Sequence, residues 1–313
     1  MVYKMNRWLF VEKDGGPAFD GRFETAAEFS EGFSWVQLRD GCAFIDRMGK
    51  ICTSRRFAEV SAFYERLASN GDGTGEGYVN YSGDWVIPPI YRDASHFSEG
   101  LAQVRKGSEK CVIDAEGEVQ FVIAAMVMGD FRGGLAMIGT HDGAFYVNKN
   151  GIRVLGPFED GEDFSEGVAR VAMDNELYFI DESGRCVVKG DYEDLSLYFS
   201  NERIAFSVDG KWGFLDRQGS VVIEPAYDDA SDFVDGVSVV RAGGKRGAID
   251  ISGSVLFMDR YSHLDSHGYG ENLFAFSRRG KAFGYLDKDG NEHISERFSE
   301  ARPFREGLAI VSL

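Results

Sequence analysis

The sequence predicts an all-β protein made of about nine tandem copies of one unit of about 34 residues. In every copy an acidic or amide residue is followed three positions later by a glycine. The two residues before this pair are apolar, and most are β-branched or aromatic, which is typical of strands. No stretch combines helical spacing with helix caps over three turns. This regularity indicates a single supersecondary unit that is copied and stacked.

The acid-to-glycine pair predicts a hairpin between two strands. Aspartate or asparagine at the first turn position can hydrogen-bond the backbone two residues on, and glycine at the fourth position supplies a positive φ. The pairs are Glu12/Gly15, Asp46/Gly49, Asn80/Gly83, Asp114/Gly117, Asn148/Gly151, Asp181/Gly184, Asp216/Gly219, Asp250/Gly253 and Asp287/Gly290. We refer to these turns as the D-x-x-G corners. Because turn preference accounts for the repeated acids, we expect no calcium site there.

The strand before each corner is predicted to be buried on both faces, because two adjacent positions are apolar. The position next to the corner holds Val11, Ile45, Val79, Ile113, Val147, Ile180, Leu215, Ile249 and Leu286. The position before it holds Phe10, Phe44, Tyr78, Val112, Tyr146, Phe179, Phe214, Ala248 and Tyr285. Such a strand belongs inside a stack of sheets.

The rest of the unit predicts a meander. A second strand follows the corner, as in VVIEP at 221–225, and its proline is expected to end the ladder because it has no amide hydrogen. Two aromatic residues spaced six positions apart then span a tight connection or a short strand. A polar turn such as FSEG at 97–100 leads into an alternating strand, LAQV at 101–104. The unit therefore has three clear strands and a possible short fourth.

We expect one domain, residues 1–313, in which the first and last strands complete a shared unit. The array starts with the strand WLFV at 8–11 and stops after the strand that should precede it, at 308–311. A ring of sheets closed from both ends would have this phase and would leave no long exposed edge. The prediction is a propeller-like closed toroid, and an open β-superhelix or solenoid is the alternative.

At its best copies the chain resembles the WG-repeat family, whose signature runs G-K-W-G-F-I-D, V-I-x-P-x-Y-D-x-A and F-S-E-G-L-A-x-V. Residues 209–233 and 90–104 match it closely, and the pattern continues through the chain in weaker form. The position of the first signature tryptophan, called the Trp slot below, holds Trp8, Cys42, Glu76, Lys110, Ala144, Leu177, Trp212, Arg246 and Phe283. The glycine slot after it is glycine only at Gly77, Gly213, Gly247 and Gly284.

The resemblance implies a non-catalytic repeat scaffold, in a family that is mostly bacterial. The Trp slot accepts charged and aromatic residues where neighbouring positions stay apolar, and surface contacts tolerate such variation. We therefore predict that Trp8, Glu76, Lys110, Trp212 and Arg246 contact a protein partner. No catalytic residue, metal ligand or cofactor is expected.

Charge narrows the choice of partner. The chain carries a formal charge of −17, which repels nucleic-acid phosphates and anionic membranes and attracts basic proteins. Charged residues near the start and the absence of a long apolar run predict a cytoplasmic protein. A sharper hypothesis is immunity: the partner is a basic bacterial toxin domain that the chain neutralises in the producing cell. Complementary charge would speed that association.

Two other function classes stay open. Carbohydrate or cell-envelope binding would use exposed aromatic rings, and the candidates are Trp8, Trp35, Trp85 and Trp212. An enzyme could lie in the irregular copy at 262–272, where His263 and His267 are four residues apart, although nearby glycines disfavour a helical zinc site.

Overall fold

The computed structural model describes residues 7–190 and 192–313, with the side chains of 266–270 left aside. Every regular element in the described residues is a β-strand, so the all-β prediction is confirmed. No described segment is a helix that is long and apolar enough to cross a membrane. Contacts divide the chain into two compact units: unit 1 comprises residues 1–28 and 191–313, and unit 2 comprises residues 29–190.

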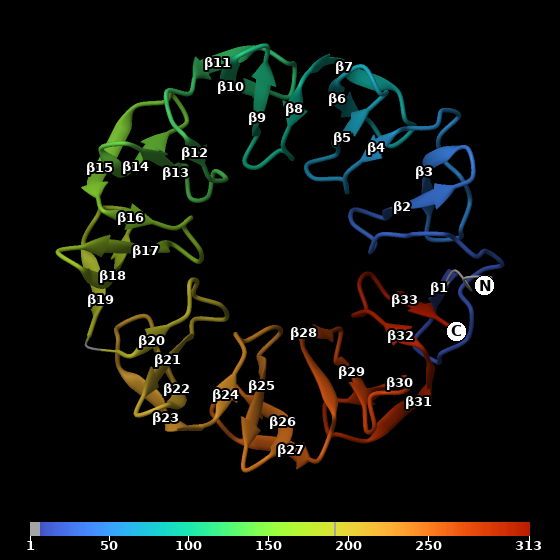
Figure 1. Ribbon diagram of the computed structural model, residues 1–313, viewed down its shortest axis with the longest axis vertical. Helices are drawn as coiled ribbons and strands as arrows, with labels where there is room; N and C mark the ends of the chain where they lie inside the picture. The colour runs from blue at the N-terminus through green and yellow to red at the C-terminus, as the bar shows by residue number, and fades with distance from the viewer. Residues whose placement is uncertain (1–6, 191) are drawn as a thin grey trace, which may run out of the picture. The chain divides into compact units, whose positions relative to one another are not determined.

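Unit 2 contains five antiparallel sheets, whose strands can be followed by label (Figure 1). The first has two strands, β2 (Phe33–Leu38) and β3 (Gly41–Asp46). The second has β4 (Glu59–Val60), β5 (Ala68–Gly71), β6 (Glu76–Val79) and β7 (Trp85–Tyr91). The third has β8 (Asp93–Ala94), β9 (Leu101–Lys106), β10 (Glu109–Asp114) and β11 (Val119–Val122). The fourth has β12 (Val127–Met128), β13 (Leu135–Thr140), β14 (Gly143–Asn148) and β15 (Arg153–Phe158), and the fifth has β16 (Asp160–Gly161), β17 (Val168–Met173), β18 (Glu176–Asp181) and β19 (Cys186–Lys189).

Unit 1 contains four antiparallel sheets. The first has β20 (Asp194–Leu195), β21 (Ile204–Val208), β22 (Lys211–Leu215) and β23 (Val221–Tyr227). The second has β24 (Asp229–Ala230), β25 (Val237–Ala242), β26 (Lys245–Asp250) and β27 (Val255–Asp259). The third has β28 (His263–Gly270), β29 (Leu273–Ser277), β30 (Phe283–Asp287) and β31 (Glu292–Phe298). The fourth has β32 (Glu300–Ala301), β33 (Ala309–Ser312) and β1 (Trp8–Val11). In it β1 pairs with β33, with Trp8 opposite Ser312 and Val11 opposite Ala309.

Each complete sheet is a meander in which consecutive strands are neighbours. The spacer between the two aromatic residues forms a short strand, such as β8 or β24, that pairs with the end of the alternating strand. The possible fourth strand is therefore confirmed.

The D-x-x-G corners have the predicted geometry. In all nine copies the glycine N–H donates to the carbonyl of the first turn residue, and eight of those first residues also accept two backbone N–H groups on one side-chain oxygen. At Asp216 these donors are Gln218 and Ser220, each at 2.9 Å. Gly219 has φ +76°, which a residue with a Cβ rarely adopts.

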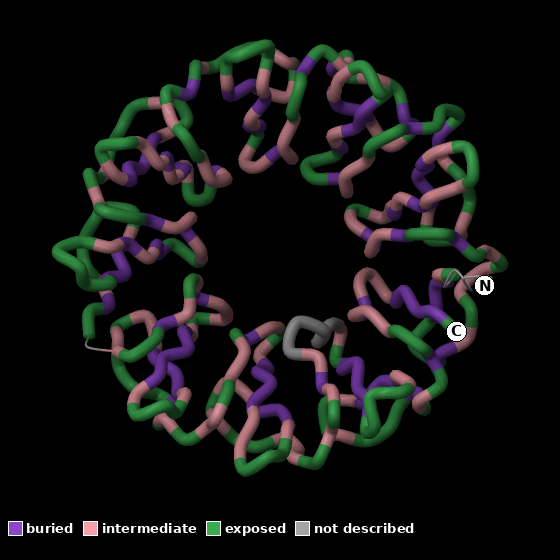
Figure 2. Tube along the Cα trace, in the orientation of Figure 1, coloured by how far each residue is buried: buried purple, intermediate pink, exposed green. Residues whose placement is uncertain are grey.

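The core lies along the strand before each corner. All eighteen residues at the two predicted apolar positions are buried (Figure 2). Clusters then join one sheet to the next: Phe214 and Ile223 pack with Val240 and Ile249 of the following sheet. Burial of both faces is thus confirmed, and each sheet completes the core of its neighbour.

The prediction that proline ends the second strand is wrong. β23 continues through Pro225 to Tyr227, and β7 continues through Pro88 and Pro89. Both are edge strands, where a missing N–H breaks no ladder. Near the prolines the register between β22 and β23 shifts, which bulges the edge strand. The bulged backbone lies so close to the glycine slot that a Cβ at Gly213 would overlap the carbonyl oxygen of Ile223.

Polar turns also join neighbouring sheets. Ser98 Oγ donates to the carbonyl of Phe131 at 2.7 Å, and Ser30 Oγ donates to the carbonyl of Phe63 at the same distance. Both bonds link positions 33 residues apart, which is one repeat.

Candidate partner-binding site

The Trp slot lies at the start of the strand that precedes each corner, and in two copies its side chain reaches the next sheet. Glu76 begins β6, and its Oε2 accepts the N–H of Ala94 in β8 at 2.6 Å. Lys110 lies in β10, and its Nζ donates to the carbonyl of Met126 at 2.5 Å, just before β12. Both side chains are half-buried. Slot residues therefore bridge sheets as well as meeting solvent.

The other three predicted contact residues lie in unit 1 and in separate sheets. Trp8 is half-buried, and the guanidinium of Arg302 lies 4.6 Å from its ring centroid. Trp212 is half-buried against a core cluster that includes Tyr227. Arg246 is half-buried in β26, opposite Asp259 in register. The structure does not bring these three together.

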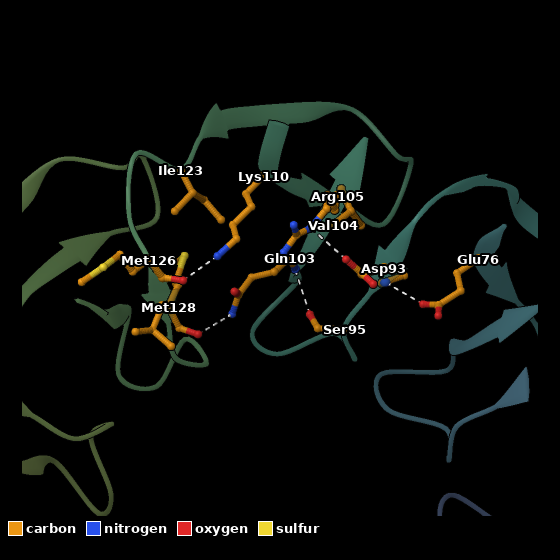
Figure 3. A pocket seen from close by; sticks show the side chains of 12 residues that line it. Glu76, Asp93, Ser95, Gln103, Val104, Arg105, Lys110, Ile123, Met126 and Met128 are labelled. Atoms are coloured by element: carbon orange, nitrogen blue, oxygen red, sulfur yellow. Dashed lines mark hydrogen bonds and ion pairs between the residues drawn. The ribbon is translucent and has the colours of Figure 1, made fainter. Parts of the chain in front are cut away.

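Glu76 and Lys110 do converge, on one open cavity in unit 2 with a volume of about 630 Å³ (Figure 3). Its lining comes from three successive sheets: Glu76 from the second, Gln103 and Lys110 from the third, and Met126 and Met128 from the fourth. This volume is within the range of sites that hold a small molecule or a few side chains of a partner.

The floor of the cavity is fixed by hydrogen bonds between sheets. Gln103 Nε2 donates to the carbonyls of Met128 at 3.2 Å and Gly129 at 3.0 Å. On the other side Arg105 Nε forms an ion pair with Asp93 at 2.8 Å. The third sheet thus bonds to two backbone carbonyls of the fourth sheet and holds the segment around β12 in place.

The acidic side of the cavity is formed by Glu76, next to the carboxyls of Glu59 and Asp93. Burial raises the pKa of the Glu76 carboxyl above its ordinary value, against the lowering effect of the Ala94 N–H. The neighbouring carboxyls of Glu59 and Asp93 raise it further. A cation placed here would relieve this repulsion, because an opposite charge favours the ionised carboxylate.

Sequence reasoning missed the apolar side of this cavity. Met126 and Val127 are 52% and 58% exposed, although each belongs to an apolar run that reads as a covered strand. The available signal was a departure from the repeat: Arg92 and Asp93 of the third sheet occupy the positions that Met126 and Val127 hold in the fourth.

The candidate sites for carbohydrate binding and for catalysis lack the features that such sites need. Trp35 and Trp85 are half-buried against the cluster around Phe44 and Phe63, so neither ring is a free platform for a sugar. His263 lies edge-on to Phe283, with ring centroids 5.2 Å apart, and the side chain of His267 is outside the described residues. Within the described chain, no three His, Cys, Asp or Glu side chains form a group that could hold a metal ion.

Solved structures are similar to this chain at low sequence identity, and one of them, with a TM-score above 0.5, shows the same fold. A eukaryotic initiation factor superposes with a TM-score of 0.61 at 11% identity, over 99% of this chain and 98% of that one. AztD from Citrobacter koseri superposes with a TM-score of 0.48 at 12% identity, over 98% of both chains. The computationally designed Ika8 protein superposes with a TM-score of 0.47 at 15% identity, over 92% of this chain and 95% of that one. Curated protein sequences gave no match.

A family model supplies the assignment. The model of the WG containing repeat matches residues 10–42, 77–109, 179–212, 212–245 and 283–313. These matches cover more than half of the chain and include the slots at Cys42, Trp212 and Phe283. The resemblance seen in the signature residues is confirmed, and the chain belongs to the family of WG-containing repeat proteins.

Proposed function

We propose that this chain is a non-catalytic scaffold that binds another protein. The main support is that some positions of the repeat are needed for folding, whereas the Trp slot varies. The corner acids, the corner glycines and the paired apolar positions are occupied in folding each sheet and packing it on the next. The Trp slot varies in charge and size, and two of its members, Glu76 and Lys110, line an open cavity. Variable positions on a constant frame are typical of repeat proteins that bind partners.

The charge of the chain favours a basic partner. With a formal charge of −17, the scaffold would attract a cationic surface and speed its encounter, while salt would slow it. The finer proposal is an immunity role, in which the partner is a basic bacterial toxin domain held inactive in the cytoplasm.

Coexpression with the product of the adjacent open reading frame tests both the scaffold proposal and the immunity proposal. The proposal expects that the two proteins copurify at physiological salt, that association weakens as salt rises, and that the neighbour is toxic only when expressed alone. If the neighbouring gene product copurifies but is harmless when expressed alone, the scaffold proposal stands and the immunity proposal fails. A neighbour that is harmless and does not copurify would contradict both.

The closed toroid stays a prediction, and the pairing of β1 with β33 within unit 1 favours it over the superhelix. Small-angle X-ray scattering tests it: the distance distribution of a ring has a depleted centre and a short maximum dimension, whereas a superhelix gives a longer maximum dimension.

A further inference from the structure

Eight of the described sheets open with an extra edge strand, and the first residue of that strand follows a charge rule. It is acidic in six of them, at Glu59, Asp93, Asp160, Asp194, Asp229 and Glu300, and the two exceptions are Val127 and His263. Asp93 pairs with Arg105 at 2.8 Å, and Asp229 pairs with Arg241 at 3.9 Å, in each case across to the neighbouring strand. The fold therefore accommodates an acid at this position without difficulty.

The fourth sheet of unit 2 breaks the rule with an apolar residue. Val127 begins β12, and it lies opposite Gly139, a residue with no side chain to cover it. Val127 is 58% exposed and Met126 is 52% exposed. Because other sheets fold with charged residues here, packing does not require these apolar side chains. An exposed apolar group with a polar rim is the mark of an interaction site.

The patch formed by Met126, Val127 and Met128 is held rigid. Lys110 Nζ binds the carbonyl of Met126, and Gln103 Nε2 binds the carbonyl of Met128. A partner that docks here would not have to order the backbone first, and this lowers the entropic cost of binding. The methionine side chains can still adapt to the shape of the partner.

Charge across the cavity defines the rest of the ligand. Arg105 forms an ion pair with Asp93, and the Lys110 ammonium lies beside the apolar patch, where it donates to the carbonyl of Met126 and keeps its charge. Glu76 is the acid on the opposite side of the cavity from the patch, and the carboxyl of Glu59 lies next to it just outside the cavity lining. An occupant that suits both sides has an apolar group for the patch and a cationic group for Glu76.

We infer that the patch of Met126, Val127 and Met128, together with Glu76, is the docking site for a segment of a basic partner protein. That segment places an apolar side chain on the patch and a lysine or arginine against Glu76. This inference rests on the proposed scaffold function and deepens it, since it names the site and the chemistry of the partner.

Random peptides of about 12 residues displayed on phage provide the probe. They are selected on the wild-type protein alone and then tested on the double variant Met126→Arg/Val127→Asp, which writes the Arg92–Asp93 pair of the third sheet into the fourth. Because the repeat already carries that pair, the variant should fold, and circular dichroism checks it. If it does not fold, Val127→Asp alone replaces it. The matched control is Val255→Asp in unit 1, which alters a valine that is 55% exposed.

Selected peptides should carry an apolar residue and a lysine or arginine a few positions apart. By fluorescence anisotropy, binding should weaken about 10-fold to 30-fold on the double variant, as expected for a hot spot, and about fivefold on Glu76→Gln. Val255→Asp should change nothing. Peptides that are acidic, or that bind the double variant as well as wild type, would overturn the inference. So would a wild-type dimer that the double variant abolishes, because the occupant would then be a second copy.

The same variants separate this inference from the proposed function. If the coexpressed partner copurifies equally with wild type and with the double variant, the scaffold function stands and this docking site is refuted. Copurification that is lost on the double variant and retained on Val255→Asp supports both.

Discussion

The Glu99 carboxylate accepts a hydrogen bond of 2.9 Å from the backbone N–H of Gly134, a residue 35 positions later, in the turn that opens the next sheet's alternating strand. Its second oxygen accepts the N–H of Gly133 at 2.7 Å. The same bond between equivalent turns recurs from Glu65 to Gly100 at 2.8 Å and from Glu271 to Gly307 at 2.7 Å. In these three copies the polar turn carries a carboxylate, called the latch below, that accepts the N–H of the next turn and fixes one sheet to its successor.

Removing a latch should loosen one junction between sheets. Burial acts to raise the pKa of Glu99, but the N–H of Gly134, Lys149 and the N–H of Gly133 together lower it, so the carboxylate is held ionised. Because the site is partly exposed, we expect Glu99→Ala to lower the free energy of unfolding by about 1 kcal/mol. Urea denaturation measures this.

The control for the latch is Glu116→Ala, which removes a carboxylate from a corner whose backbone N–H still donates to Asp114. A surface change of this kind should stay within about 0.5 kcal/mol. Equal losses for the two variants would mean that the latch adds no stability beyond that of a surface carboxylate.

The D-x-x-G corner predicts a sharp difference between two substitutions of Asp216. Asp216→Ala removes the oxygen that accepts the N–H groups of Gln218 and Ser220, at an expected cost of about 1 kcal/mol. Asp216→Asn should cost much less, because Asn80 and Asn148 accept the equivalent pair of bonds in their own corners. Thermal unfolding of both variants makes the comparison, and an equal loss would show that charge, rather than the turn bonds, matters at the corner.

The glycine slot predicts a large steric effect. A methyl group at Gly213 would overlap the carbonyl of Ile223 and approach the backbone of Pro225, both in the bulged edge strand. We expect Gly213→Ala to destabilise the protein by about 3 kcal/mol, the upper end for overpacking. The reverse change at the equivalent slot, Ala43→Gly, creates no overlap and should cost about 0.5–1 kcal/mol. Urea unfolding that ranks Ala43→Gly as the more harmful variant would contradict this role of the bulge.

His96 and Asp130 predict a pH-dependent junction between the third and fourth sheets of unit 2. Their side chains lie 3.2 Å apart. The hydrogen bond to Asp130 raises the pKa of His96 against the effect of burial, while the hydrogen bond from His96 lowers the pKa of Asp130. Arg132 opposes and Glu65 supports protonation of His96. The pair is therefore ionised below the raised histidine pKa and above the lowered aspartate pKa.

The stabilisation from His96 is fully present below its ordinary pKa of 6.5 and is lost as pH rises through the raised value in the folded state. The contribution of Asp130 is lost as pH falls through its lowered pKa. We expect His96→Gln to reduce the melting temperature more at about pH 5.5 than at about pH 8.5. A larger reduction at the higher pH would reverse the expected sign and contradict the ion pair.

Much of the fold follows from local sequence. The corners and the two buried positions were predictable because each depends on residues within one hairpin, as at Asp216 and Phe214. The path of the edge strand through Pro225 was not, because the bulge depends on a glycine in another strand. Two sequence candidates, Glu76 and Lys110, do share a cavity, but Met126 and Gln103 join it only through contacts between sheets. The local sequence does not indicate that residues of different sheets will line one cavity, except where a residue departs from the repeat.

Hydrogen–deuterium exchange on the protein with and without a selected peptide tests the central claim most directly. Our interpretation is that constant positions build the sheets, and that the copy in which Val127 replaces the acid of the opening strand binds the partner. It predicts slower amide exchange on peptide binding at 103–110 and 123–128, with little change in unit 1. Slower exchange confined to residues 192–313, with 123–128 unaffected, would contradict it.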